Sequence, residues 1–460
     1  MYMKKIGIGL AAALPVLGLA TGPVKQPNIV FVLVDDLGIG DLSLYGQRFF
    51  KTPNIDALAD QGLVYTQHYA GCTVSAPSRG VLMTGRHTGH SYIRGNINAP
   101  NVDGHTYDLP LLDSEVTIAE LLKSSGYRTA CIGKWGLGGP GTEGHPNRQG
   151  FDYFYGYLGQ LNAHRHFPEF LHENETLIEL SGQYAQELLM QKALGYISDR
   201  AKDDQPFFLY LTPVIPHADL QAPDEDKEQF IGKYPEVPYN GGSYRAEIAP
   251  RATFAAMIHR LDQDMGRLVQ HLKEEGIWEN TIVIFTSDNG THIEGGHDPY
   301  FFDSNGPFRG TKRDLYDGGI RTPLVISWPD KIKERRVTDH ISAFWDFFPT
   351  FAEIAGVKSP VQSDGISMLP TILGDDAAQR QHSSLYWEFH ELGGRQAIRV
   401  GDWKLIRLNV KNPDKSTLEL YNLSSDPGEQ FNLASQYPDT RDALLEILDS
   451  SRTRSEVFGW

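Results

Sequence analysis

Buried strands that alternate with helical segments predict an α/β fold, in which helices cover both faces of a large sheet. Three apolar runs indicate buried strands, at residues 28–34, 207–211 and 281–285. Between the last two runs, apolar residues recur every three or four positions, as in an amphipathic helix: Ile258, Leu261, Met265, Leu268 and Leu272. Each strand ends in a polar loop, where open α/β sheets usually bind ligands.

The pattern changes near residue 380. Four short alternating segments, at residues 385–389, 396–400, 403–406 and 418–422, are followed by a helical segment at 440–451. This predicts a small antiparallel sheet with one helix. A chain of 460 residues is long enough for one large domain and a smaller one. We therefore expect a catalytic domain over 23–378 and a C-terminal subdomain over 379–460.

The first 20 residues have the pattern of a secretory signal. Lys4 and Lys5 precede an apolar run at 6–13, and small residues follow near Ala20. We assign residues 1–22 to a Sec signal peptide and expect a periplasmic or secreted protein. No cysteine follows the apolar run, so we do not expect a lipoprotein anchor, and no later stretch has the length and apolarity of a membrane span.

The composition excludes several classes of partner. The formal net charge is −16, with acidic residues spread along the chain, which disfavours nucleic acid and anionic membranes. The two cysteines, Cys72 and Cys131, are expected to be free buried thiols, although export would allow a disulfide. The glycine-rich loop at 138–146 lacks a following Gly-Lys-Ser/Thr, and Gly38-Ile39-Gly40 lacks the third glycine of a dinucleotide site, so ATP and NAD are not expected.

Oxygen-bearing side chains follow two of the predicted strands. Asp35 and Asp36 end the first strand, and Asp288 and Asn289 end the third. Adjacent carboxylates repel one another, and a cation between them removes that cost. Hard oxygen donors without a thiol favour Ca²⁺, with Mg²⁺ as runner-up, over Zn²⁺. The alternative is that both segments are simply turns. A metal site requires both strands to end at one edge of the sheet.

The string Ser75-Ala76-Pro77-Ser78-Arg79, followed by Gly80 to Arg86, is the most specific motif in the chain. In the plainer interpretation it is a turn, and Ser78 caps a helix that begins at Arg79. It also resembles the maturation signature of the formylglycine-dependent type I sulfatases, in the serine-type form of bacterial carbohydrate sulfatases similar to arylsulfatases. Further segments resemble that family in the same order: Gly133 to Gly138, Pro216-His217, Gly310 to Arg313, and Asp317 to Pro323, with Asp317 where Glu is usual.

The resemblance implies an alkaline-phosphatase-like fold and a set of functional residues. Ser75 would be oxidised to 3-oxoalanine (formylglycine) by a serine-type maturase, and its hydrate would be the nucleophile. The implied metal ligands are Asp35, Asp36, Asp288, Asn289 and the modified Ser75. Positive charge for a sulfate ester would come from Arg79, Lys134 and Lys312, and the leaving alcohol would receive its proton from His217 or Lys312.

Gly136 departs from the family pattern. A histidine stands at this position in most relatives and contacts the formylglycine hydrate. We therefore expect another group to act as proton acceptor, and His87, His164 and Lys134 are the candidates by neighbourhood.

Polar and aromatic residues in or near predicted loops are candidate substrate contacts. Gln160 or His164 lies where relatives place a sulfate-contacting residue, and sugar contacts are assigned to His166, Arg94, His297 and Trp387. The predicted function is hydrolysis of sulfate esters of carbohydrates, with a sulfated glycan fragment as substrate. The alternatives are a phosphonate or phosphate ester hydrolase of the same superfamily, and a non-catalytic glycan-binding protein with unmodified Ser75.

Overall fold

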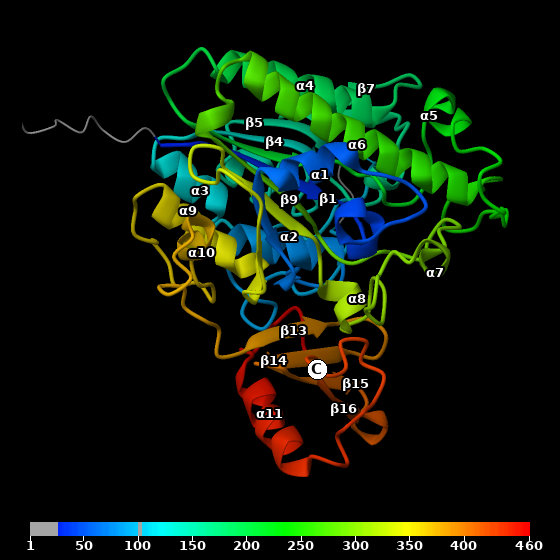
Figure 1. Ribbon diagram of the computed structural model, residues 1–460, viewed down its shortest axis with the longest axis vertical. Helices are drawn as coiled ribbons and strands as arrows, with labels where there is room; N and C mark the ends of the chain where they lie inside the picture. Colours follow the sequence, from blue (N-terminus) through cyan, green and yellow to red (C-terminus); the bar gives the residue numbers. More distant parts are fainter. Residues whose placement is uncertain (1–25, 100–103) are drawn as a thin grey trace, which may run out of the picture.

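The large domain is built on a ten-stranded mixed sheet (Figure 1). The computed structural model describes residues 26–99 and 104–460, so the signal peptide expected at 1–22 lies outside the described residues. The strand order is β11-β2-β10-β9-β1-β8-β4-β5-β6-β7. The strands are β1 (Asn28–Val34), β2 (Gly62–Tyr65), β4 (Arg128–Lys134), β5 (Tyr153–Tyr157), β6 (Phe170–Glu173), β7 (Thr176–Glu179), β8 (Phe207–Thr212), β9 (Thr281–Ser287), β10 (Leu324–Ser327) and β11 (Arg336–Thr338).

The centre of the sheet is parallel. Strand β1 pairs with β9 on one side and β8 on the other, and β4 continues beyond β8. Val34 lies opposite Ser287, so β1 and β9 end side by side. The expectation that the two acidic strand ends meet at one sheet edge is therefore confirmed. The mixed character comes from β10, which is antiparallel to β9 and β2, and from β6, which is antiparallel to β5 and β7.

Alternate residues of the central strands enter two separate cores. Ile29, Phe31 and Leu33 of β1 pack on one face, whereas Val30 and Val32 pack on the other. One face is covered by α1 (Pro53–Asp60), α4 (Ala185–Arg200) and α6 (Pro250–Glu274), and the other by α2 (Ser75–Thr84), α3 (Ile118–Ser124) and α9 (Phe347–Ile354) (Figure 1). The predicted amphipathic helix is α6, with its apolar face buried. A sheet covered on both faces is thus confirmed.

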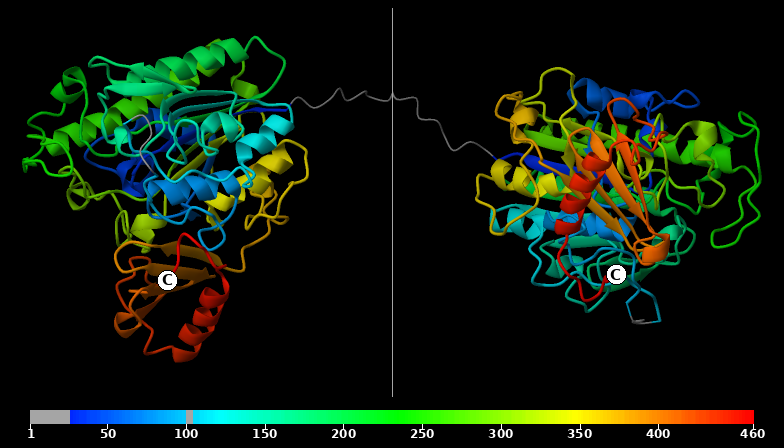
Figure 2. Two further views of the ribbon diagram at one scale, coloured as in Figure 1. Left: turned by 180° about the vertical axis from the view of Figure 1, so that it is seen from behind. Right: turned by 90° about the horizontal axis from the view of Figure 1, so that it is seen from below.

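A separate four-stranded antiparallel sheet forms the C-terminal part, in the order β13-β14-β15-β16 (Figure 2). Its strands are β13 (Leu385–Phe389), β14 (Arg395–Val400), β15 (Trp403–Leu408) and β16 (Thr417–Asn422), and α11 (Pro438–Ser450) follows them. One face, including Ile398 and Leu405, packs on Leu444 and Leu448 of α11. The other face, including Trp387, joins the core of the large domain. The predicted small sheet with one helix is confirmed.

Short elements complete the chain. They are β3 (His68–Tyr69), β12 (Ser342–Ala343), α5 (Asp224–Glu228), α7 (Pro299–Phe302), α8 (Asp317–Ile320) and α10 (Leu369–Leu373). Cys72 and Cys131 are both buried and unpaired, as the sequence predicted. Within the described ranges, no helix combines the length and the apolar character needed to cross a membrane.

Candidate active site

Ser75 is the first residue of α2 and lies at the carboxyl edge of the central strands. Its Oγ donates to Oδ1 of Asp35 at 3.0 Å, and Nζ of Lys134 lies 3.2 Å from the same Oγ. Lys134, the last residue of β4, also donates to Oδ2 of Asp35 at 2.6 Å. The start of a helix favours negative charge, since its backbone N–H groups are unpaired. Ser75 therefore stands where a developing anion is stabilised.

The helix begins four residues earlier than the plainer interpretation of the motif required. It starts at Ser75 and not at Arg79, so Ser78 is no N-cap. Instead, Oγ of Ser78 donates to the backbone oxygen of Asp288 at 2.5 Å and accepts from the backbone nitrogen of Gly71. Ser78 thus connects α2 to the loop that follows β9.

The four predicted metal ligands of the strand ends converge. Asp35, Asp36, Asp288 and Asn289 are fully buried. The backbone nitrogen of Asp36 donates to Oδ1 of Asp288 at 3.1 Å, and Nδ2 of Asn289 donates to Oδ1 of Asp36 at 2.6 Å. Arg79 binds Oδ2 of Asp288 through Nε at 3.1 Å and Nη2 at 2.8 Å. One arginine therefore holds the third carboxylate in place.

The charges in this cluster act strongly on one another. Burial and the neighbouring charge of Asp35 raise the pKa of Asp288 to about 7, although Arg79 opposes the rise. Burial alone would raise the pKa of Asp35 too, but the charges of Lys134, Arg79 and Lys312 hold it well below its usual range. The carboxylates therefore repel one another, and further positive charge would stabilise them.

These residues fit a divalent cation. Oδ1 of Asn289 is buried and has no hydrogen-bond partner among residues 26–99 and 104–460. Asp35, Asp36 and His217 each offer an atom within 4.8 Å of the others. A buried carbonyl oxygen without a donor, beside three carboxylates, is the oxygen-rich donor set of Ca²⁺ or Mg²⁺.

Lys312 and His217 form the second half of the site. Nζ of Lys312 lies 2.8 Å from Oδ2 of Asp36, 3.0 Å from Oε2 of Glu294 and 3.1 Å from Nε2 of His217. Burial and the charge of Lys312 lower the pKa of His217 far below its usual value. Asp36 and Glu294 outweigh the effect of burial and raise the pKa of Lys312. The pair thus consists of a charged ammonium and a neutral imidazole.

Two neighbours of this pair were missed by the sequence analysis. Glu294 lies in the loop after β9 and bonds to both Lys312 and Arg313. The ring of Tyr244 lies 5.2 Å from that of His164 and 6.3 Å from that of His217. No motif includes either residue. Glu294 at least follows a strand that ends at this sheet edge, whereas Tyr244 lies in the irregular segment between α5 and α6.

The loop after β5 lies against the same cluster. The ring of His164 stacks on that of His217 at a centroid distance of 4.9 Å, and Gln160 lies beside Gly136. His166 is buried, and its Nε2 lies 2.8 Å from the backbone oxygen of His217. His166 therefore supports the His217 loop, which corrects its assignment as a sugar contact.

Three other predicted sugar contacts are packing residues. Arg94 is 2% exposed and bonds to Glu388 and Thr453. Trp387 has no exposed surface, and its Nε1 donates to the backbone oxygen of Ala70. His297 is buried, with its ring 3.7 Å from that of Phe254. The assignment of all three to the substrate is corrected, because their polar groups and rings are engaged by other residues of the protein, away from the cluster around Ser75.

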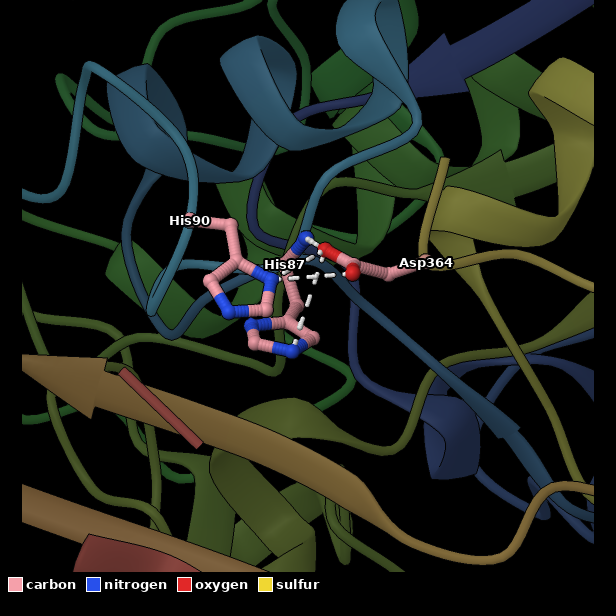
Figure 3. A group of neighbouring side chains, drawn as sticks. All are labelled: His87, His90 and Asp364. Atoms are coloured by element: carbon pink, nitrogen blue, oxygen red, sulfur yellow. Dashed lines mark hydrogen bonds and ion pairs between the residues drawn. The ribbon is translucent and has the colours of Figure 1, made fainter. Parts of the chain in front are cut away.

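His87 lies in a different cluster, with His90 and Asp364 (Figure 3). The two rings stack at 4.3 Å, and Nδ1 of His90 lies 2.9 Å from Oδ1 of Asp364. The backbone nitrogen of Gly89 donates to Nδ1 of His87, so a neutral ring carries its proton on Nε2, which faces Asp364 at 3.7 Å. This proton placement favours a hydrogen-bonded link between two loops over a metal site, since a ligating Nε2 must be unprotonated.

His87 lies too far from Ser75 to take part in the reaction, because the length of α2 separates the two residues. Ser75 begins this ten-residue helix, which spans about 15 Å, and His87 follows its end. The hypothesis that His87 replaces the missing family histidine is therefore wrong. Of the three candidates, His164 and Lys134 lie at the cluster.

Comparison with known proteins decides the family. Residues 27–357 match the family model described as sulfatase, and residues 308–453 match the one described as N-sulphoglucosamine sulphohydrolase, C-terminal. The chain belongs to the sulfatase family. It is accordingly a sulfuric ester hydrolase, and the residues gathered around Ser75 form the candidate active site of that enzyme.

Similar proteins cover nearly the whole sulfatase chain. It is 32% identical to human arylsulfatase A, over 99% of this chain and 92% of that protein. It is 30% identical to the N-acetylgalactosamine-6-O-sulfatase of Bacteroides thetaiotaomicron, over 94% of each chain. The solved structure of Ps i-CgsB in complex with k-i-k-neocarrahexaose has a TM-score of 0.78 at 28% identity and covers 93% of both chains. The solved structures similar to this sulfatase have the alkaline-phosphatase-like fold that the sequence predicted.

Proposed function

We propose that this sulfatase hydrolyses sulfate esters of carbohydrates through a formylglycine made from Ser75 and a bound Ca²⁺, with Mg²⁺ as runner-up. The observation that carries the proposal is the position of Ser75. Its Oγ lies at the start of α2, 3.0 Å from Oδ1 of Asp35 and 3.2 Å from Nζ of Lys134. A nucleophile in this position has an acceptor for its proton and a cation for its negative charge.

The metal and the modified residue would supply chemistry that a serine lacks. Asp35, Asp36, Asp288 and Asn289 would hold the cation, which supplies positive charge that polarises the nucleophile and the sulfate. Formylglycine supplies, as its hydrate, an ionisable hydroxyl and a second hydroxyl that allows the aldehyde to reform.

The remaining residues of the cluster orient the reacting groups and neutralise their charge. Lys134 holds the side chains of residue 75 and Asp35, and its charge offsets that of a sulfate oxygen. Arg79 fixes Asp288 and also donates to the backbone oxygen of Lys134 at 2.9 Å, so it ties β4 to the loop after β9. Lys312 and His217, 3.1 Å apart, hold a proton beside the cluster, and we assign them the protonation of the leaving alcohol.

Relatives support a carbohydrate substrate. Two groups of relatives are named for N-acetylgalactosamine 6-sulfate, and Ps i-CgsB is bound to an oligosaccharide. We propose a sulfated galactose-type sugar as the substrate. The basic and apolar pattern of residues 1–22 supports export to the periplasm or the medium, and the serine at position 75 implies modification by a serine-type maturase.

The test is turnover by matched esters. Purified protein from a host with a serine-type maturase is assayed on N-acetylgalactosamine 6-sulfate, on its 6-phosphate, and on a phosphonate monoester. We expect hydrolysis of the sulfate ester alone, seen as released sulfate with no released phosphate or phosphonate, and loss of turnover but not of binding in Ser75→Ala. A phosphonate monoester hydrolase shares the fold, with a TM-score of 0.66 at 20% identity. Preferred cleavage of a phosphorus ester would therefore support that function and overturn this one.

A further inference from the structure

A cavity of about 590 Å³ lies between α4 and the first residues of β4 and β5. These elements belong to the side of the large domain that faces away from the C-terminal sheet (Figure 1). The helix contributes residues three or four positions apart, and thus one of its sides: Leu188, Gln191, Lys192, Gly195, Tyr196, Asp199 and Arg200. The sheet contributes Arg128, Asp152, Tyr153 and Tyr155. Cavities of this size and aromatic character are typical of small-molecule sites.

The cavity is separate from the active site. Arg128 is the first residue of β4 and Lys134 the last, so a strand of about 20 Å lies between them. Tyr153 likewise begins β5, whereas the loop that carries His164 follows the end of this strand. The cavity therefore lies at the amino ends of the strands, and the cluster around Ser75 lies at their carboxyl ends.

Three tyrosine rings form a wall of the cavity. The rings of Tyr153 and Tyr196 are nearly parallel, with an interplanar angle of 9° and a centroid distance of 6.4 Å. The hydroxyl of Tyr153 donates to Oε1 of Glu173 at 2.6 Å, which fixes its ring. Nζ of Lys192 lies 4.7 Å from the centre of the Tyr155 ring. Tyrosine combines an apolar ring with a polar hydroxyl, which suits the C–H groups and hydroxyls of a sugar.

Gly195 leaves open space beside these rings. It lies inside α4, where glycine is less favourable than alanine. A Cβ added at this position would meet no atom within 4 Å, so no close neighbour requires glycine there. The glycine instead keeps the cavity open along the helix.

Among the residues that the structure describes, Arg128 is the one charged group of the cavity without an opposite charge. Its Nε donates to the neutral Oε1 of Gln205 at 3.0 Å. The other charged groups are paired with residues outside the cavity: Asp152 with Lys123, Lys192 with Glu173, Asp199 with Lys202, and Arg200 with Asp203. An uncommitted guanidinium suits an oxyanion such as a sulfate group, which it can bind through two parallel N–H groups.

We propose that this cavity binds a sulfated sugar unit of a glycan, at a second site that takes no part in hydrolysis. The sugar packs against the tyrosine rings, and Arg128 binds its sulfate group. Such a site holds a glycan chain at the enzyme while other units of the glycan reach Ser75. The choice of sugar rests on the proposed function, because a glycan with repeated sulfate esters supplies the same unit to both sites.

Two variants test the cavity. Gly195→Leu places a side chain in it, and Arg128→Gln removes its unpaired charge. The matched controls are Gly195→Ala, which adds a methyl group alone, and Arg380→Gln, which removes a charge at an exposed position elsewhere. Because leucine is a better helix former than glycine, the Tm of Gly195→Leu should be no lower than that of the parent.

Calorimetry measures binding of a hexasaccharide that contains N-acetylgalactosamine 6-sulfate. Protein with unmodified Ser75 is used, so that hydrolysis does not consume the ligand. We expect two sites per chain in the parent and both controls, and one site in Gly195→Leu. In Arg128→Gln the affinity of the second site should fall by about 10- to 100-fold, as for a lost hydrogen bond to a charged group. The desulfated hexasaccharide should show the same weakening in the parent.

Hydrolysis is measured separately on N-acetylgalactosamine 6-sulfate itself, with the modified enzyme. Because distant sites act independently, kcat/KM on this monosaccharide should stay within about twofold of the parent in all four variants. A larger loss in Gly195→Leu would contradict a second site that takes no part in hydrolysis.

The results separate this inference from the proposed function. If Gly195→Leu binds as many hexasaccharides as the parent, the inference is overturned, whereas hydrolysis by the parent leaves the function intact. If Gly195→Leu loses a site but the parent hydrolyses no sulfate ester, the function fails and the second site stands. If Gly195→Leu changes the molecular mass of the protein in solution, measured by sedimentation, the cavity is an interface between copies of the chain, and the inference is overturned.

Discussion

The backbone nitrogen of Asp36 donates to Oδ1 of Asp288 at 3.1 Å, joining the loops after β1 and β9 across 252 residues of sequence. The two strands are parallel neighbours, so their ends meet without a connecting element. This contact brings the acidic side chains of both loops into one buried cluster. The stability of the loops should therefore depend on what neutralises that cluster.

Removal of the metal should destabilise the protein. Chelation leaves the buried carboxylates of Asp35, Asp36 and Asp288 facing one another, and each repulsion costs about 1 kcal/mol or more. We expect a lower Tm after chelation, measured by calorimetry, and recovery when Ca²⁺ is added. Asp204→Ala, at an exposed position, should respond to chelation as the parent does. Equal Tm values with and without metal would show that the cluster binds no ion.

The effect on kcat of removing the proton donor should depend on the leaving group. In Lys312→Ala or His217→Ala, we expect kcat to fall by about 10²- to 10⁴-fold on a sugar sulfate. The leaving group of an aryl sulfate is a weakly basic phenolate, which needs less protonation. The fall in kcat should therefore be smaller on an aryl sulfate. Steady-state kinetics on both esters gives the comparison. Equal losses on the two esters would assign Lys312 and His217 to binding.

Lys404 should be essential for docking of the C-terminal sheet. Its buried Nζ lies 2.8 Å from Oδ1 of Asp317 and 2.9 Å from Oε1 of Glu429. Lys404→Met leaves Glu429 without its cation and Asp317 with Arg321 alone, and breaking a buried pair costs about 3–5 kcal/mol. We expect a clear fall in Tm. Lys415→Met, at an exposed position, is the matched control and should leave Tm unchanged.

The stability of the fold should depend on pH through Glu388. Burial raises the pKa of Glu388, but His390, Arg452 and Arg94 outweigh it and lower the pKa to about 2. Because the folded-state pKa lies below the unfolded value, the ionised carboxylate stabilises the fold above about pH 4.5, and this contribution is lost as the pH falls toward 2. The shift corresponds to about 3 kcal/mol.

Thermal melts at pH 6, 4.5 and 3.5 measure this dependence. Glu388→Gln should lower Tm at pH 6 and show a smaller further loss on acidification than the parent. Glu446→Gln, at an exposed position of α11, should follow the parent curve. If Tm falls equally with pH in Glu388→Gln and in the parent, Glu388 is not the source of the pH dependence.

The sequence predicted those parts of the site that follow apolar strands or stand in the motif of Ser75. The runs at 28–34 and 281–285 placed Asp36 and Asp288 at strand ends, and parallel pairing then brought them together. Glu294 and Tyr244 have no such marker, because irregular loops bring them to the site. Their positions depend on loop conformations that no periodic pattern encodes.

Two of the wrong sugar contacts, Trp387 and Arg94, have a common physical cause. Trp387 was expected beside a ligand, but every residue of β13 is buried, since one face of its sheet packs on α11 and the other on the large domain. Arg94 and its partner Glu388 are buried in the same contact. Local sequence does not show that a second layer covers a strand. Likewise, the contact between Gly136 and Gln160 joins two loops that only the fold brings together.

The mass of the peptide that contains Ser75, from protein made with and without a serine-type maturase, tests the central claim most directly. Oxidation of serine to formylglycine removes two hydrogen atoms, and the same samples are assayed on a sulfate ester. We predict that the mass loss and the turnover appear together, and that protein carrying only serine is folded and inactive. Full turnover by protein whose residue 75 is unmodified serine would contradict the account.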